Sequence, residues 1–235
     1  VVLVMIFSLA KIDLLSWGKL TLQELVNIWK RLMLVGIPAM VTNVLVPVAS
    51  GFLLAMVDKM GEQAVEEFGV GARLEPFSIV VILALTSTIP VFVGQNFAAG
   101  QHERIWQVLS VAVRFILVWQ LAVWLLLWLT SPLLANIFSQ DQAVIDKIVN
   151  YLMLMPIGYA GMGIVLCANS ALNALQKTGV SMLMNLVRLT ALYVPLAWLG
   201  GQYYGFEGLL FGAAMGNTIA GIIVWILIKR AQAKE

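Results

Sequence analysis

The stretch from Pro76 to Phe97 limits most strongly what this chain can fold into. It is almost wholly apolar, and it is long enough to cross a bilayer as a helix, since about 20 residues suffice. Over the whole chain of 235 residues, 61% are hydrophobic and 11% are charged, whereas a soluble domain has about 25% charged residues. The sequence therefore predicts an all-α integral membrane protein whose main partner is the lipid bilayer.

Polar segments divide the chain into six apolar stretches. We predict membrane-spanning helices at about 32–57, 76–97, 108–129, 148–171, 182–199 and 208–228, joined by polar loops at 58–67, 98–104, 131–147, 173–178 and 202–207. Pro156 and Gly158 are expected to interrupt the fourth helix.

The segment before the first predicted span differs in pattern from the rest. Residues 1–10 are apolar and begin with Val1, so we expect them to be the tail of a preceding transmembrane helix in a longer chain. In residues 11–31 apolar positions recur every three to four residues, which indicates an amphipathic linker at the membrane surface. The predicted domains are therefore residues 1–31 and a six-helix lobe with a polar carboxy-terminal tail, residues 32–235.

Charges are distributed unequally between alternate loops. One side holds nine basic residues, which are Lys11, Lys19, Lys30, Arg31, Arg104, Lys177, Lys229, Arg230 and Lys234. The other side holds Lys59 and Lys147 together with seven acidic residues. By the positive-inside rule we expect both ends of the chain in the cytoplasm and the protein in the inner (plasma) membrane. The net charge of +2 is too small to indicate a nucleic-acid partner.

Residues for enzyme chemistry are scarce. The single histidine, His102, lies in a predicted loop, and the single cysteine, Cys167, lies in an apolar stretch where we expect it to be buried. A histidine-based triad, a histidine or CxxC metal site and a glycine-rich phosphate loop are therefore excluded. We predict that the protein is not an enzyme and that it carries no cofactor.

Glu75, near the start of the second span, is the main candidate functional residue. Burying a carboxylate in a membrane costs at least about 3 kcal/mol, so such residues usually have a use. A desolvated carboxylate can take up a proton near neutral pH. The alternative is an interfacial charge paired with Arg73 or with a neighbouring helix.

Other polar residues within the spans are further candidates for an ion or substrate site. Asn43 lies between Pro38 and Pro47, where freed carbonyl groups can line a cavity. Asn169 and Asn173 fall with Gln176 at i, i+4 and i+7, which predicts a polar stripe on one helical face, although solvation of the helix end explains Asn173 and Gln176 equally well. Arg188 either pairs inside the protein or extends to the interface.

Glycines in the sixth span have a different interpretation. Gly208, Gly212 and Gly216 form a GxxxGxxxG pattern, which predicts close helix packing rather than ligand binding.

Several motifs together resemble a known family. GARLEPF and VGQNFAAGQ in the second span and its exit, NALQKTG before MLMNLVRLTALYVPLAWLGG, and YYGFEGLLFGAAMGNTIAG are similar to helices eight, eleven and twelve of multidrug and toxic compound extrusion (MATE) transporters. The resemblance implies the carboxy-terminal lobe of a twelve-helix secondary antiporter. Such proteins export cationic or amphipathic drugs in exchange for H⁺ or Na⁺, and the partner lobe would be an amino-terminal six-helix half that lies outside this sequence.

The chain departs from one branch of that family at two places. Where that branch has a cation-binding glutamate on helix seven this sequence has Val46, and Met162 or an uncharged neighbour replaces its helix-ten aspartate. Glu75 then remains as the membrane carboxylate, and the coupling ion stays open. Two alternatives also stay open. One is a lipid-linked oligosaccharide flippase, in which Arg73, Arg114 and Arg188 would neutralise a pyrophosphate, and the other is a non-transporting membrane scaffold.

Overall fold

The structure is a computed structural model that describes residues 21–138 and 140–233, apart from the side chain of residue 143. The predictions for residues 1–20, which are the tail of a preceding helix and much of the amphipathic linker, lie outside the described residues. Contacts divide the chain into two units, residues 1–37 and residues 38–235, and the boundary falls inside helix α2 (Leu22–Asp58). Each unit is described by itself.

In the first unit the described residues form the beginning of α2. Thr21 and Glu24 make a capping box: the Glu24 backbone N–H donates to Thr21 Oγ1 at 3.3 Å, and the Thr21 N–H donates to Glu24 Oε2 at 2.9 Å. The helix therefore begins at Leu22, about ten residues before the predicted start of the first span. The last part of the predicted linker is continuous with that span.

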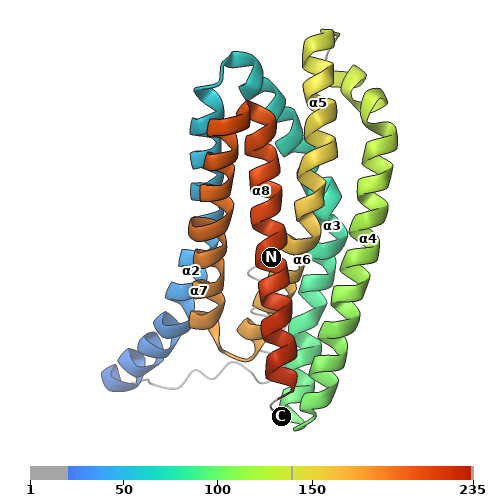
Figure 1. The fold of residues 1–235 in the computed structure, drawn as a ribbon. Coiled ribbons are helices and arrows are strands. Elements are labelled where there is room, and N and C mark those ends of the chain that lie inside the picture. Colours follow the sequence, from blue (N-terminus) through green and yellow to red (C-terminus); the bar gives the residue numbers. More distant parts are fainter. Residues whose placement is uncertain (1–20, 139, 234–235) are drawn as a thin grey trace, which may run out of the picture. The chain divides into compact units, whose positions relative to one another are not determined.

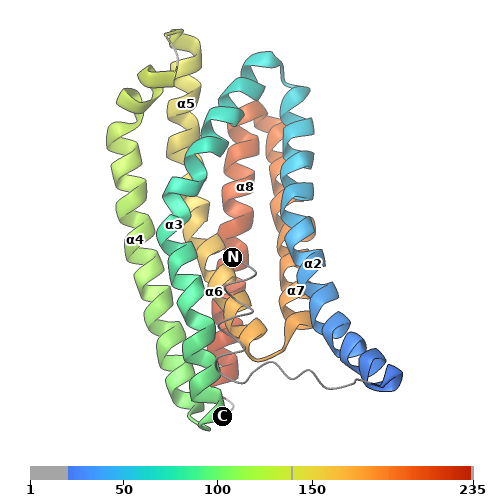
Figure 2. The same ribbon diagram turned by 180° about the vertical axis from the view of Figure 1, so that it is seen from behind.

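The second unit is a bundle of helices (Figures 1 and 2). After the rest of α2 it comprises α3 (Glu62–Ala98), α4 (His102–Phe138), α5 (Gln142–Leu154), a 3-10 turn (Met155–Gly158), α6 (Tyr159–Ala174), α7 (Thr178–Val187), a π-helical turn (Arg188–Tyr193) and α8 (Val194–Gln232). Among the described residues, five helical segments are long and apolar enough to cross a membrane: 22–58, 62–98, 102–138, 144–174 and 178–232. The prediction of an all-α membrane protein is confirmed.

The last of the five segments reverses direction inside α8. Gly205 has φ 62° and ψ −146°, a backbone conformation that essentially only glycine adopts. On either side of it the chain packs against itself, because the backbone of Gly200 contacts Gly208 and Gly212 lies against Leu196. The chain thus turns back within the predicted loop at 202–207, where Gly205 is the residue that departs from helical geometry. The contacts confirm the close helix packing predicted from the glycine pattern.

Two predicted loops are wrong in length. The charged loop predicted at 58–67 is reduced to residues 59–61 between α2 and α3, and the polar connection predicted at 131–147 is largely helical. The reason is that the polar residues Glu67 and Ser131 are both fully buried inside helices. Helices α2, α3 and α4 each have 37 residues, or about 55 Å, and so extend well beyond a hydrocarbon core of about 30 Å.

The predictions for the fourth span agree better with the structure. Pro156 lies in the 3-10 turn that separates α5 from α6, so the predicted interruption is confirmed. Cys167 on α6 is 1% exposed and is therefore the buried residue that its apolar neighbours predict.

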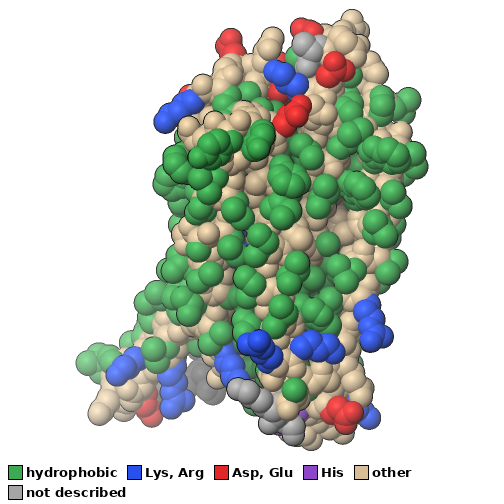
Figure 3. All heavy atoms as spheres, viewed as in Figure 1, with side chains coloured by type: hydrophobic (Ala, Val, Ile, Leu, Met, Phe, Trp, Pro, Cys, Tyr) green, Lys and Arg blue, Asp and Glu red, His purple; other side chains and the backbone are tan. Residues whose placement is uncertain are grey.

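Two buried apolar clusters hold the second unit together. The first joins α2, α3, α5 and α8 through residues such as Leu53, Val70 and Leu209. The second joins α3, α4, α6 and α8 through residues such as Ile82, Val165 and Val224. Apolar side chains also cover much of the outer surface, which suits contact with lipid (Figure 3).

Candidate functional site

Polar side chains lie along the bundle between the two apolar clusters. On α3, Glu75 and Ser78 fall between Val70 of the first cluster and Ile82 of the second. Three more buried polar residues also lie, along their own helical segments, between residues of the first cluster and residues of the second. They are Gln120 on α4, Arg188 in the π-helical turn and Asn217 on α8. We call the five residues Glu75, Ser78, Gln120, Arg188 and Asn217 the polar layer.

Arg188 is the most deeply placed charge of the polar layer. Its side chain is 5% exposed, and its Nη1 donates a hydrogen bond of 2.8 Å to Asn217 Oδ1 on α8. Within the part of the chain that the structure describes, the buried Nε has no hydrogen-bond partner. Arg188 is therefore held inside the protein and does not extend to the interface. It also begins a π-helical turn, a distortion that is frequent at functional sites.

Glu75 is half-buried and lies within electrostatic range of Arg188. The carboxylate interacts electrostatically with the Arg188 guanidinium, which belongs to a different helical segment. Arg73, the sequence-local alternative, is exposed. The structure thus favours the pairing of Glu75 with another helix over pairing with Arg73.

Three tyrosines lie near the same carboxylate, of which Tyr151 and Tyr159 are buried and Tyr193 is partly buried. Tyr151, Tyr159 and Tyr193 all lie within electrostatic range of Glu75, and a side-chain hydrogen bond links Tyr151 to Tyr159. The ring of Tyr151 packs directly over Gly71, one turn before Glu75, where any Cβ atom would overlap it. Glu75 therefore has a guanidinium and several phenol groups as neighbours.

Gln120 and Ser78 connect α4 to α3 in the polar layer. Gln120 is 2% exposed and its Nε2 donates to the Ser78 carbonyl oxygen at 3.1 Å. Sequence reasoning did not select either residue. A glutamine in the middle of an apolar span was the signal that could have found Gln120.

The remaining sequence candidates do not join the polar layer. Asn169 is buried and accepts a hydrogen bond of 3.0 Å from Ser181 Oγ, which ties α6 to α7, whereas Asn173 and Asn43 are exposed. The predicted stripe that included Gln176 is wrong, because α6 ends at Ala174 and Gln176 has φ 58°.

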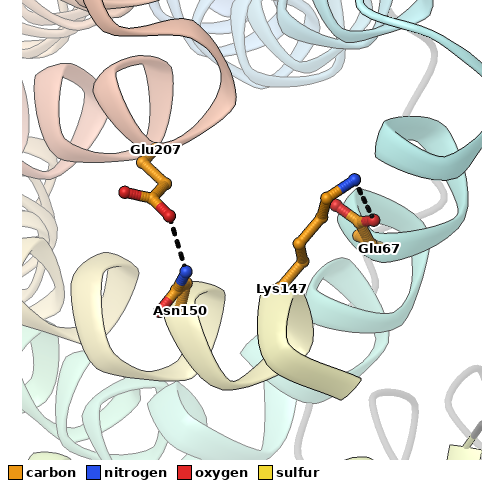
Figure 4. Close-up of polar contacts among 4 residues, drawn as sticks. All are labelled: Glu67, Lys147, Asn150 and Glu207. Atoms are coloured by element: carbon orange, nitrogen blue, oxygen red, sulfur yellow. Dashed lines mark hydrogen bonds and ion pairs between the residues drawn. The ribbon is translucent and has the colours of Figure 1, made fainter. Parts of the chain in front are cut away.

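A second polar arrangement lies near one end of the bundle (Figure 4). Glu67 on α3 is fully buried, and its Oε1 lies 3.0 Å from Nζ of Lys147 on α5, whose side chain is 38% exposed. The distance makes this an ion pair, although the ammonium group is not aligned for a good hydrogen bond. One turn further along α5, Asn150 Nδ2 donates to Glu207 Oε1 on α8 at 2.6 Å.

These contacts fix α5 from two sides, and sequence reasoning missed them. Glu67 was assigned to a loop. Its spacing of four and eight residues from Gly71 and Glu75 was the signal that all three share a helical face.

The chemistry open to the polar layer is proton exchange and ion pairing. Among the described residues, no group of three or more His, Cys, Asp or Glu side chains could hold a metal ion. What the layer offers is one carboxylate that can change its charge beside one fixed guanidinium, in a largely apolar environment.

Comparison with known proteins gives consistent matches. The model of the family described as MatE matches residues 38–199. Over 202 residues the chain is 36% identical to a FAD transporter of Shewanella oneidensis, covering 86% of this chain and 45% of the relative. Over 227 residues it is 23% identical to the multidrug export protein MepA of Staphylococcus saprophyticus, covering 95% of this chain and 49% of the relative.

Solved structures agree with these matches. The crystal structure of a mutant of VcmN, a MATE transporter of Vibrio cholerae, is similar with a TM-score of 0.88 and 30% sequence identity. The similarity covers 97% of this chain and 52% of VcmN. The chain therefore spans about half the length of each of these proteins.

Proposed function

Because this chain belongs to the MatE family, whose members are transporters rather than enzymes, we propose that it forms the carboxy-terminal half of an ion-driven exporter. The coverage of about half of each relative supports this division. The chain reversal at Gly205 supports six membrane crossings, since it divides the last of the five apolar segments into two antiparallel helices. The other half would supply the facing wall of the transport cavity.

We place the ion-coupling step at Glu75, and the observation that carries this is its charge interaction with the buried Arg188. Proton uptake by Glu75 would remove the negative charge that faces the guanidinium. The attraction between α3 and the π-helical turn would then weaken, while Arg188 keeps its hydrogen bond to Asn217 on α8. Proton uptake by Glu75 is thereby linked to a change in how α3 packs against the π-helical turn and α8.

Either coupling cation, H⁺ or Na⁺, adds one positive charge at Glu75, and the nearby guanidinium opposes the binding of both. The two gradients are therefore tested separately. Among the other sequence candidates, the exposed Asn43 and Arg73 remain available to contact substrate or the other half, and Asn169 and Asn173 are assigned no step.

Two substrate classes deserve testing. Cationic or amphipathic drugs follow from the family resemblance and from the likeness to MepA. An anionic dinucleotide such as FAD is the second candidate, favoured by the greater identity to a FAD transporter and by the unpartnered Nε of Arg188, which could bind a phosphate oxygen. The family match speaks against the scaffold and adds no support to the oligosaccharide flippase. From the charge asymmetry of the loops we place both chain ends in the cytoplasm.

The test uses the full-length transporter in proteoliposomes, with an imposed H⁺ or Na⁺ gradient and either ethidium or FAD as the transported probe. Glu75→Gln is expected to insert normally and to lose gradient-driven transport. Glu66→Gln is the matched control, because Glu66 is an exposed glutamate on the same helix and its loss should leave transport unchanged. Gradient-driven transport by Glu75→Gln at the wild-type rate, with equal amounts of protein, would refute the role of Glu75. Movement of neither probe under either gradient would refute the exporter itself.

A further inference from the structure

An apolar cavity separate from the polar layer lies at one end of the bundle. It has a volume of about 360 Å³ and is enclosed by α4, α6, α7 and the end of α8. Its walls are formed mainly by residues such as Leu109, Leu172, Met184 and Leu227, and no residue of the polar layer lines it. The volume falls within the range of about 300–1,000 Å³ that is typical of small-molecule sites.

Basic side chains border this cavity. His102 at the start of α4 and Lys177 just before α7 both line it, and both are exposed. The His102 ring is held edge-on against Phe97, with 5.5 Å between ring centroids. Three further positive charges, from Arg104, Lys229 and Arg230, lie within two residues of lining residues in the sequence, and Glu103 adds one negative charge. Figure 3 shows basic side chains gathered at the end of the bundle where α8 ends.

The depth of the cavity relative to the bilayer follows from α8. Leu227, Ile228 and Ala231 line the cavity, and Lys229 and Arg230 interrupt this run. Lys229 lies over the Trp225 ring at 4.9 Å from its centroid. A tryptophan beside a basic pair where an apolar helix ends is typical of the interface between hydrocarbon and headgroups. The cavity thus opens where lipid chains meet lipid headgroups.

We propose that this cavity binds an anionic phospholipid, with an acyl chain among the apolar side chains and the phosphate beside Lys177 and His102. The apolar walls suit a hydrocarbon chain and the basic rim suits a negative headgroup, as in basic pockets between transmembrane helices that bind anionic lipids. A neutral phospholipid would gain the apolar contacts but little from the rim. The site is independent of the transport role proposed for Glu75.

The experiment is native mass spectrometry of the full-length transporter, released in a mild detergent from membranes with equal phosphatidylglycerol and phosphatidylethanolamine. Phosphatidylglycerol is expected to be retained preferentially. Lys177→Gln should lower its retention about fivefold, from a contribution of about 1 kcal/mol per basic residue. Val180→Trp should abolish retention, because Val180 lines the cavity and its side chain, 55% exposed, leaves room for an indole to fill it.

Two control variants separate this site from general effects. Lys59→Gln removes an exposed lysine that lines a different pocket, and Val118→Trp adds an indole at a position that is 71% exposed and outside the cavity. Both should retain phosphatidylglycerol like the wild type. Equal retention of the two lipids would overturn the proposal, and so would unchanged retention in Val180→Trp or an equal loss in Lys177→Gln and Lys59→Gln. Transport in proteoliposomes is measured separately, so either proposal can fail without the other.

Discussion

Removal of the cation beside Glu67 should destabilise the bundle in a way that depends on pH. In Lys147→Met the Glu67 carboxylate stays fully buried and loses the ammonium group 3.0 Å away. Leaving one charge of a buried pair without its partner costs about 3–5 kcal/mol. The alternative is that Glu67 takes up a proton, which at pH 7 costs about 1.36 × (7 − 4.3), or about 3.7 kcal/mol, for an ordinary glutamate pKa of about 4.3.

Of the two responses, the one with the lower free-energy cost sets the loss of stability. Lys147→Met should therefore lower the free energy of unfolding by about 3–4 kcal/mol at pH 7. At pH 5 the proton costs only about 1.36 × 0.7, or about 1 kcal/mol, so most of the loss should disappear. Glu67→Leu should cost about 1 kcal/mol or less, because it leaves behind a lysine that is 38% exposed and can turn to water. The double variant should resemble Glu67→Leu.

The assay is reversible unfolding of the full-length transporter in bicelles at pH 7 and pH 5. Lys59→Met serves as the matched control, since Lys59 is an exposed lysine between α2 and α3. The reasoning is refuted if Lys147→Met loses no more stability than this control. A loss of the same size at both pH values would show that the buried carboxylate is not its cause.

Two backbone predictions follow from the glycines. Gly221→Ala should lower the free energy of unfolding by about 1–3 kcal/mol, because its Cβ would overlap the backbone of Gly161 where α8 crosses α6. Gly94 is a helical glycine with open space around it, so Gly94→Ala should have little effect in the same bicelle assay. Equal losses in the two variants would argue against the close crossing. Gly205→Ala should cost about 1–3 kcal/mol, because alanine is strained at φ 62° and ψ −146°. The midpoint of thermal unfolding, compared with Gly179→Ala as a helical control, measures this, and an unchanged midpoint would contradict the tight reversal.

The sequence by itself was sufficient for several properties that depend on local runs of residues. Apolar stretches identified the membrane protein, Pro156 located the break in the fourth span, and the glycine pattern predicted the close packing of the last hairpin. Each of these depends on hydropathy or backbone geometry over a few turns, which neighbouring residues determine. The ends of the helices were less predictable, because polar residues such as Glu67 and Ser131 can lie inside a helix when other helices bury them.

Only the tertiary structure decided which polar groups meet. The rotation of each helix and the register between helices are set by packing along their whole length, and a single sequence does not contain that information in any local pattern. Arg188 therefore hydrogen-bonds to Asn217, twenty-nine residues away, and Lys147 on α5 pairs with Glu67 on α3. Glu75 lies within electrostatic range of Arg188, which belongs to a different helical segment. The predicted stripe of Asn169, Asn173 and Gln176 failed for another reason, because α6 ends at Ala174, before the third residue that helical spacing required.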